Sequence, residues 1–196
     1  SVGAAERGAL LPSGDIEPHD VVLGLASNGL HSNGFSLVRK VAEVEGLKFG
    51  DPAPFDTSRS LGEALLDPTR IYVKSCLAAI KKSEVKALAH ITGGGLIENI
   101  PRILPEGLGV DLYAKSWDLP AVFPWLAKAG GIQPREMART FNCGIGMVII
   151  ASPDHAADIQ EILREHGEEV TPIGEVVERP DGDAVIVHDI EEAWKV

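Results

Sequence analysis

Four short apolar segments constrain the fold of this 196-residue chain more than any other feature. They occupy residues 20–27, 85–92, 108–114 and 143–152, and segments with helical signals separate them. Apolar runs of this length that end at turn residues are typical of buried strands. Two further strands are expected at 171–179 and 183–190, joined as a hairpin across "PDGD". This alternation of strands and helices predicts an α/β fold.

A single domain is expected for residues 1–196, because the composition does not shift along the chain. Its predicted architecture has two layers, with helices packed on a mixed β-sheet. Helices are expected at 35–46, 67–83, 96 onwards and 152–167. Asp67 is the predicted N-cap of the second helix, with Pro68 at the first helical position. Residues 50–60 contain two prolines and are expected to form a loop.

The charge balance excludes some classes of partner. The chain has 18 basic and 29 acidic residues, a net charge of −11, and its mean hydropathy of +0.06 is typical of globular proteins. Duplex nucleic acid and anionic membranes are bound mainly by positive surfaces, so neither is an expected partner. A small anionic substrate needs only a local group of hydrogen-bond donors. No apolar run approaches the roughly 18 residues that span a membrane.

The two cysteines, Cys76 and Cys143, lie far apart in the sequence and lack partners at zinc-site spacing. They are expected to be buried thiols rather than metal ligands or nucleophiles. Such thiols are typical of a reducing compartment, and we therefore expect a cytoplasmic protein. No pair of Asp or Glu residues stands in a recognisable metal-binding motif, so no residue of this chain is expected to hold a metal.

The first candidate site is "SNGLHSNG", residues 27–34, between a predicted strand and a predicted helix. Gly29 and Gly34 allow a close ligand approach, and either Ser32 or Asn33 can cap the helix. Free amides at a helix start form an anion site, and His31 can contact phosphate or exchange a proton. A capped turn with a surface histidine explains the segment equally well.

Two further glycine-containing segments follow or precede strands. "GGG" at 93–95 can be a backbone cradle for phosphate or simply a tight turn. His90, just before it, is expected to be a core residue. In "RTFNCGIGM", Asn142 can hold a ligand with its amide or close the turn, and Gly144 is a weaker candidate. Ligands of α/β proteins usually bind at such strand ends.

Three stretches together resemble one enzyme family: "GLASNGLHSNGFSLVRK", then "DPTRIYVKS" with "AHITGGGLIENIPRILP", then "MARTFNCGIGM". In combination and order they are similar to the phosphoribosylformylglycinamidine cyclo-ligases, also called aminoimidazole ribonucleotide synthetases. The similarity runs through almost the whole chain. Selenophosphate synthetase, thiamine-monophosphate kinase and a hydrogenase maturation protein share the architecture, but we do not expect "LHSNGFSLVRK" or "RTFNCGIGM" in them.

The resemblance implies a fragment of a larger enzyme. It covers only the C-terminal half of the family's chain, so the N-terminal half, with its nucleotide and Mg²⁺ ligands and the homodimer core, is expected to be missing here. The implied reaction converts formylglycinamidine ribonucleotide and ATP to aminoimidazole ribonucleotide, ADP and phosphate in purine biosynthesis. This chain would form one wall of the active-site cleft and would be inactive alone.

The same resemblance assigns roles to residues of the three segments. His31 is the expected catalytic residue, and the expected substrate-binding residues are Ser27, Asn28, Gly29, Ser32, Asn33, Gly93, Gly94, Gly95 and Asn142. Two alternatives remain open. The chain can be a non-catalytic domain that binds a phosphorylated metabolite or a partner, or it can belong to a kinase-like relative.

Overall fold

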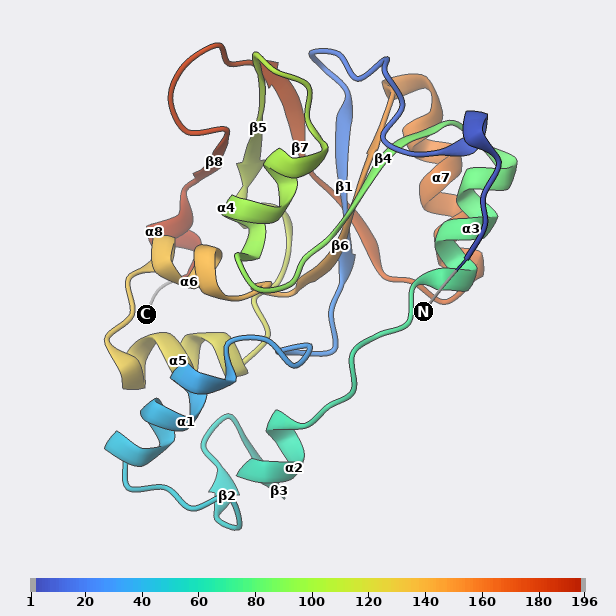
Figure 1. The fold of residues 1–196 in the computed structure, drawn as a ribbon. Helices are drawn as coiled ribbons and strands as arrows, with labels where there is room; N and C mark the ends of the chain where they lie inside the picture. Colours follow the sequence, from blue (N-terminus) through green and yellow to red (C-terminus); the bar gives the residue numbers. More distant parts are fainter. Residues whose placement is uncertain (1–2, 195–196) are drawn as a thin grey trace.

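The computed structural model describes residues 3–194 and contains a six-stranded sheet with helices on both faces (Figure 1). The strands of this sheet are β1 (Val21–Ala26), β4 (Val85–His90), β5 (Leu108–Tyr113), β6 (Ile145–Ala151), β7 (Val170–Glu178) and β8 (Val185–His188). Their spatial order is β4-β6-β1-β7-β5-β8. All neighbours are antiparallel except β5 and β8, which are parallel. The predicted α/β fold with a mixed sheet is therefore confirmed.

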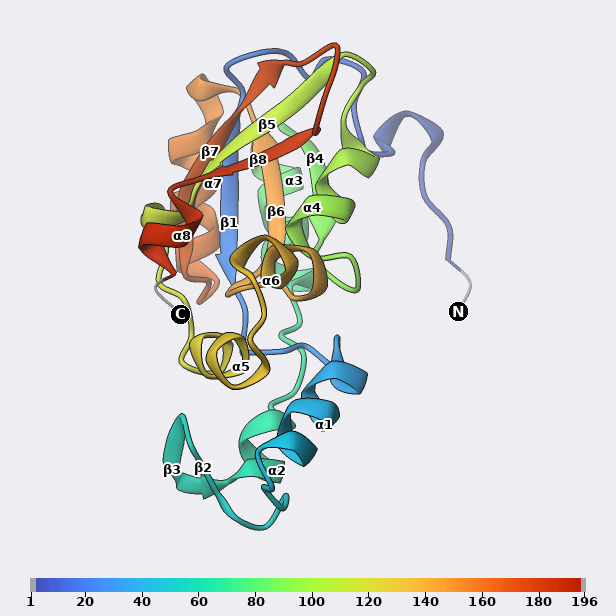
Figure 2. The same ribbon diagram turned by 90° about the vertical axis from the view of Figure 1, so that its left-hand side faces the viewer.

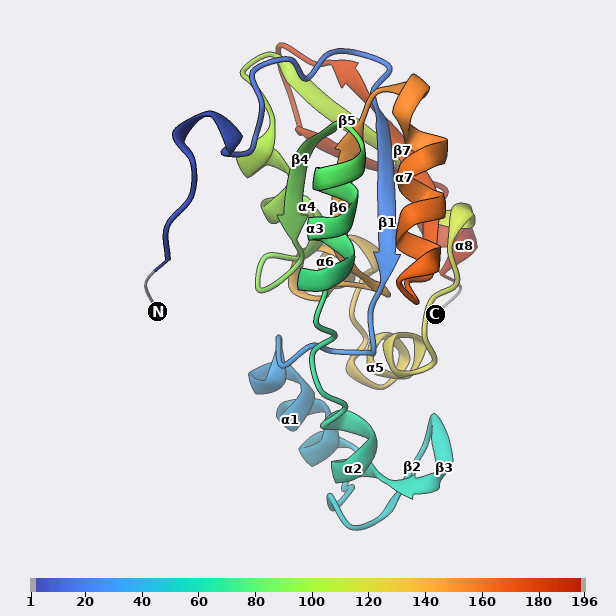
Figure 3. The ribbon, with the colours of Figure 1, turned by 90° about the vertical axis from the view of Figure 1, so that its right-hand side faces the viewer.

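The helices divide between the two faces, where a single helical layer was expected. Helices α3 (Val73–Lys82) and α7 (Pro153–Glu165) cover β1 and β6 on one face (Figure 3). Helices α4 (Gly95–Asn99) and α6 (Pro134–Thr140) lie on the other (Figure 2). Strand β1 supplies residues to both cores, because Val22 and Leu23 point to opposite faces. The sheet is therefore a buried central layer.

A smaller group of elements lies beyond the end of β1 (Figure 1). It contains α1 (Phe35–Val44), α2 (Leu61–Leu65), α5 (Val122–Gly130) and the two-stranded sheet of β2 (Pro52–Ala53) and β3 (Asp56–Ser60). The remaining short elements are α8 (Ile190–Ala193) and the 3₁₀ helices Arg7–Ala9, Ile100–Ile103 and Ala114–Ser116. Residues 52–60, predicted as loop, thus contain a small sheet. The helix predicted at 35–46 is α1, which ends at Val44 with Glu45 as its C-cap, and Gly46 follows in a left-handed conformation.

The predicted terminal hairpin is wrong. Strands β7 and β8 do not pair with each other, because β5 lies between them. Val110 of β5 faces Val176 of β7 on one side and Val185 of β8 on the other. The turn "PDGD" is consequently part of a wider crossover around β5. Two strands that are consecutive in the sequence pair with each other only when no third strand lies between them in the sheet.

The predicted helix at 67–83 begins later than expected. Helix α3 starts at Val73, and residues 67–72 have no regular structure. The N-cap of α3 is Tyr72 and not Asp67, whose carboxylate instead accepts two hydrogen bonds from the Arg59 guanidinium, at 2.6 and 2.9 Å. Proline at 68 also disfavours a helical backbone at residue 67. This irregular segment becomes important at the candidate site.

Candidate functional site

Residues 27–34 form a tight polar loop between β1 and α1, as the sequence predicted. Gly29, His31, Ser32 and Gly34 all have left-handed backbone angles, with φ of 112°, 52°, 58° and 72°. Gly34 is the N-cap of α1, so the expected caps Ser32 and Asn33 do not hold. A side chain at Gly34 would overlap the ring of Phe141. The glycine there is therefore required by packing as well as by the backbone angle.

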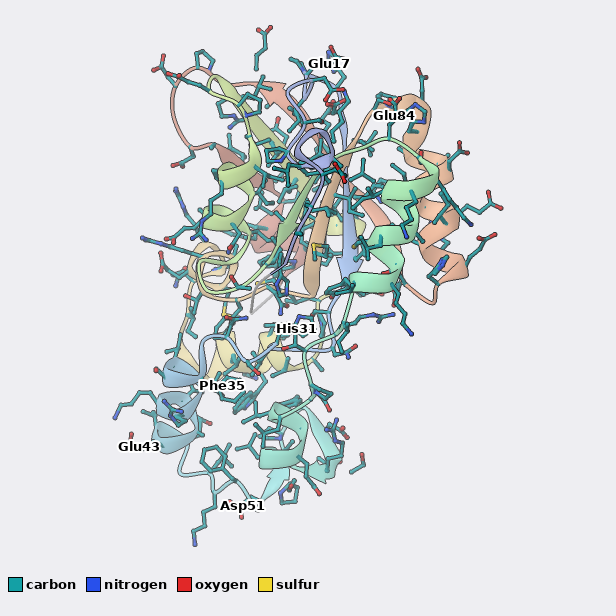
Figure 4. The ribbon with its side chains drawn as sticks, turned by 45° about the vertical axis from the view of Figure 1, so that its right-hand side comes forward. Glu17, His31, Phe35, Glu43, Asp51 and Glu84 are labelled. Atoms are coloured by element: carbon teal, nitrogen blue, oxygen red, sulfur yellow. The ribbon has the colours of Figure 1, made fainter. Side chains whose placement is uncertain are left out.

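His31 lies between the sheet and the group of elements around α1 and α2 (Figure 4). Only 3% of the residue is exposed. Its Nε2 atom accepts hydrogen bonds from the backbone N–H of Asn28 at 2.9 Å and of Arg70 at 3.3 Å. These two donors assign the proton to Nδ1, which meets no hydrogen-bond partner within residues 3–194. The ring is thus engaged as an acceptor.

The environment of His31 keeps the imidazole neutral. Burial, followed by the nearby charges of His90 and Arg70, lowers its pKa from 6.5 to about 4. A neutral ring that accepts two backbone hydrogen bonds holds the loop in shape. The expected proton-transfer role of His31 stays a prediction, and the structure gives this residue a second, positioning role.

Asn142 joins the loop to the start of β6. Its side-chain N–H donates to the Gly29 carbonyl at 2.7 Å, and its Oδ1 accepts from the Gly144 N–H at 2.9 Å. The Ser27 hydroxyl also lies 3.0 Å from that Oδ1. Asn142 is completely buried, so its amide acts within the protein. Of the two alternatives for Asn142, the structure contains the turn-closing one, and it connects two of the motifs identified in the sequence.

The three consecutive glycines do different things. Gly94 is the N-cap of α4, with φ of 106°, and a side chain at Gly95 would overlap the Ala138 carbonyl. These two glycines are explained by a tight turn, which Asn99 closes by donating to the Gly95 carbonyl at 2.8 Å. Gly93 is exposed and not required by crowding: the nearest described atom to an added Cβ is Asn33 Oδ1, at 3.9 Å. A ligand-cradling role stays a prediction for Gly93 in particular.

The same distance shows that the first two candidate segments lie side by side, although β6 separates their strands. The residues exposed to solvent there are Asn28, Ser32 and Gly93, with Asn33 half-buried. A hollow of about 310 Å³ adjoins the loop and is lined by Asn28, Gly29, Leu30, Phe55, Arg59 and Asp67, among others. The structure thus provides an accessible polar surface around a buried, hydrogen-bonded frame.

His90 corrects one sequence prediction. It was expected in the core, but it is exposed at the end of β4. Its ring packs edge-on against Tyr72, with 6.4 Å between ring centroids. Both residues line an apolar hollow of about 460 Å³ beside α3. The end of β4 alternates in burial: Leu88 is half-buried, Ala89 is buried and His90 is exposed, so His90 lies on the same side of the strand as Leu88.

Three residues that matter at the loop were missed: Arg70, Tyr72 and Glu168. Arg70 donates to His31, Tyr72 donates from its hydroxyl to the Ala26 carbonyl at 2.7 Å, and Glu168 pairs with Arg70 at 2.8 Å. The proline at 68 disfavours a helical backbone at residue 67 only, so it does not mark residues 68–72 as non-helical. No local pattern marks Glu168.

The cysteines are buried as predicted. Burial raises the pKa of Cys76 to about 11, and it raises that of Cys143 as well. Neither thiol is therefore a reactive thiolate at neutral pH. Within residues 3–194, no cluster of three or more His, Cys, Asp or Glu side chains is placed to bind a metal.

Comparison with known proteins decides the family. The family described as "AIR synthase related protein, C-terminal domain" matches residues 17–187. The chain belongs to this family. Across the described part of the chain, no helix is long and apolar enough to cross a membrane.

Solved structures share the fold of this family member at low sequence identity. Thermotoga maritima PurL complexed with AMPPCP matches with a TM-score of 0.55 and 16% identity over 93% of this chain and 25% of that one. Thiamine-monophosphate kinase from Stenotrophomonas maltophilia matches with a TM-score of 0.60 and 14% identity over 94% and 54%. Escherichia coli HypE, a hydrogenase maturation protein, matches with a TM-score of 0.55 and 19% identity over 88% of this chain and 47% of that one. The chain thus spans a quarter to about half of the chains it resembles.

Proposed function

We propose that this chain forms one wall of the active site of an ATP-dependent cyclo-ligase. The reaction converts formylglycinamidine ribonucleotide and ATP to aminoimidazole ribonucleotide, ADP and phosphate. The observation that carries the proposal is the Asn142 hydrogen bond to the Gly29 carbonyl, at 2.7 Å. It joins "SNGLHSNG", which runs into "LHSNGFSLVRK", to "RTFNCGIGM"; we do not expect "LHSNGFSLVRK" or "RTFNCGIGM" in the relatives of the cyclo-ligases. Neighbouring structures of PurL hold ATP, ADP or FGAR, which supports a nucleotide and a ribonucleotide as ligands.

The chemistry of this reaction depends on positioning and on charge. ATP phosphorylates the oxygen of the formyl amide. A nitrogen of the amidine then attacks the formyl carbon, and phosphate leaves as the ring closes. Catalysis of phosphoryl transfer rests mainly on holding the reactants and stabilising the transferring group. The donors that this chain can offer are the side chains of Asn28, Ser32 and Asn33 and the backbone at Gly93. His31 holds those donors in place, and its contribution to proton transfer is part of the proposal.

Magnesium is assigned no site in this chain. The described residues lack a suitable carboxylate cluster, so they do not fit a metal-binding role. The proposal therefore includes a further nucleotide- and metal-binding domain as partner. Homodimerisation and a cytoplasmic location belong to the same proposal.

The test uses the full-length protein that contains this chain. We expect it to form aminoimidazole ribonucleotide and ADP together, measured by mass spectrometry and a coupled ADP assay. Gly93→Val should lower kcat/KM at least tenfold, because a side chain there would occupy the ligand surface. Gly50→Val is the matched control, since an added Cβ at either exposed glycine meets no crowding. Full activity of Gly93→Val would contradict the proposed ligand surface.

A phosphotransferase is the second candidate, favoured by the fold shared with thiamine-monophosphate kinase at a TM-score of 0.60. The same assay separates the two. ADP formed with a stable phosphorylated acceptor and no imidazole ring would indicate a kinase. Binding of the ribonucleotide in calorimetry without any ADP formation would indicate a non-catalytic binding domain.

A further inference from the structure

The irregular segment 67–72, called the strap from here on, runs past the candidate loop on its way from α2 to α3 (Figure 1). It contacts the loop region at three points. The Asn28 side chain donates to the Pro68 carbonyl at 3.3 Å, and the Arg70 backbone N–H donates to His31 Nε2 at the same distance. The Tyr72 hydroxyl donates to the Ala26 carbonyl at 2.7 Å. The strap is therefore part of the frame that shapes the loop.

An ion pair between the half-buried Arg70 and the buried Glu168 fixes the strap from the other side. The Arg70 guanidinium lies 2.8 Å from Glu168 and also donates to the Gly167 carbonyl. The Ser75 hydroxyl lies 2.6 Å from the second oxygen of Glu168 and 2.9 Å from the Tyr72 carbonyl. Only 5% of the Glu168 side chain is exposed, so its charge depends on these partners.

The packing beneath the strap leaves little room for it to move inward. Gly146 of β6 lies against the rings of Tyr72 and His31. A Cβ at Gly146 would overlap the Tyr72 hydroxyl and lie 2.7 Å from His31 Cε1. His31 itself has a left-handed backbone, which its neighbours must maintain. The hydrogen bonds to the strap and the ion pair behind it are the means of doing so.

We propose that Glu168, acting through Arg70, is a positioning residue for the loop of residues 27–34. Glu168 does not touch the loop, but it anchors the side chain of Arg70, and the backbone N–H of Arg70 donates to His31 Nε2. Without that anchor the strap moves outward and the His31 acceptor loses one donor. The exposed Asn28 and the half-buried Asn33 then lose their fixed placement. The role for ligand binding rests on the proposed function, whereas the mechanical coupling does not.

Amide hydrogen exchange tests the coupling without any turnover. Glu168→Gln and Arg70→Met remove the ion pair, and Arg135→Met is the control because it breaks the exposed pair with Asp183, whose side chains are 69% and 60% exposed. In both test variants the amides of Asn28 and Arg70 should exchange at least tenfold faster. The amide of Ile149, at the centre of β6, should stay within twofold of the unmodified protein.

Two outcomes would overturn the proposal. Unchanged exchange at Asn28 and Arg70 in both variants would show that the ion pair does not hold the loop. An equal acceleration at Ile149 would show that the pair only stabilises the fold.

In the full-length enzyme we expect Glu168→Gln and Arg70→Met to raise KM for the phosphorylated substrate about tenfold. Their kcat should stay within threefold of that of the unmodified enzyme. A full-length protein that shows no turnover would count against the proposed function while leaving the exchange result intact.

Discussion

His31 is a titratable residue that folding removes from water, so its charge state is linked to folding. Its pKa falls from 6.5 to about 4 in the folded protein, mainly through burial. Between these values the unfolded chain binds a proton that the folded chain does not. The free energy of unfolding is therefore highest above pH 6.5 and decreases as the pH falls through this window. The full shift corresponds to about 3 kcal/mol, of which solvent screening removes a part.

The corresponding prediction concerns acid stability. His31→Gln keeps an acceptor near the Asn28 and Arg70 amides but cannot titrate. Between pH 7 and pH 4.5 the unmodified protein should lose about 2 kcal/mol more stability than this variant. Urea unfolding at several pH values measures the difference. Identical pH profiles for the unmodified protein and His31→Gln would contradict the prediction.

At the scale of elements, α2 and α3 differ in how they begin: side chains cap the start of α2, whereas no side chain caps the start of α3. Ser60 and Glu63 form a reciprocal capping box at α2: the Glu63 N–H donates to the Ser60 hydroxyl at 3.3 Å, and the Ser60 N–H donates to the Glu63 carboxylate at 3.0 Å. Asp67 looked like the cap of the next helix, but it binds Arg59 instead. The stable helix start in this region is therefore the one at Ser60.

We accordingly expect Ser60→Ala to lower the free energy of unfolding by about 1 kcal/mol. Asp67→Ala should cost less, because its ion pair with Arg59 is more than one-third exposed. Urea unfolding of both variants gives the comparison. A larger loss for Asp67→Ala than for Ser60→Ala would mean that Asp67 does support α3.

Local patterns predicted the elements better than their pairing. The four apolar segments became β1, β4, β5 and β6, because each carries its own burial signal. The hairpin of β7 and β8 failed because the position of β5 is decided by packing across the whole sheet. At the site, glycine and polar residues identified the loops correctly. The acceptor role of His31 depends on Arg70, 39 residues away. Glu168 depends on Arg70 and on Ser75, the latter 93 residues away, and no local pattern contains these pairs.

At the scale of the whole molecule, a buried ion pair ties the N-terminal segment to the edge strand β4. The Lys86 ammonium lies 2.8 and 3.0 Å from the two oxygens of Asp20 and donates to the Asp15 carbonyl at 2.9 Å. Asp20 is almost completely buried. The Ser13 N–H donates to the Lys86 carbonyl at 2.8 Å, which continues the attachment along the strand.

Lys86→Met should destabilise the protein by about 3 kcal/mol, because it leaves the Asp20 carboxylate buried without a counter-charge. The double variant Lys86→Met with Asp20→Leu should recover most of that loss, since apolar residues can fill the same space. Thermal and urea unfolding of the three proteins measure both effects. Equal stability of the single and double variants would show that the charge of Asp20 is not what makes the single change costly.

The place of β1 in the sheet has a consequence for the order of biosynthesis. Val21 pairs with Ala151 on one side and with Glu175 on the other, so both neighbours of this strand are made more than a hundred residues later. At 5–20 residues per second, the apolar run "VVLGLA" leaves the ribosome on the order of ten seconds before a partner exists. During synthesis, β1 is therefore an exposed, aggregation-prone apolar segment until its partner strands have been made. A chaperone that binds unfolded chains would protect it in that interval.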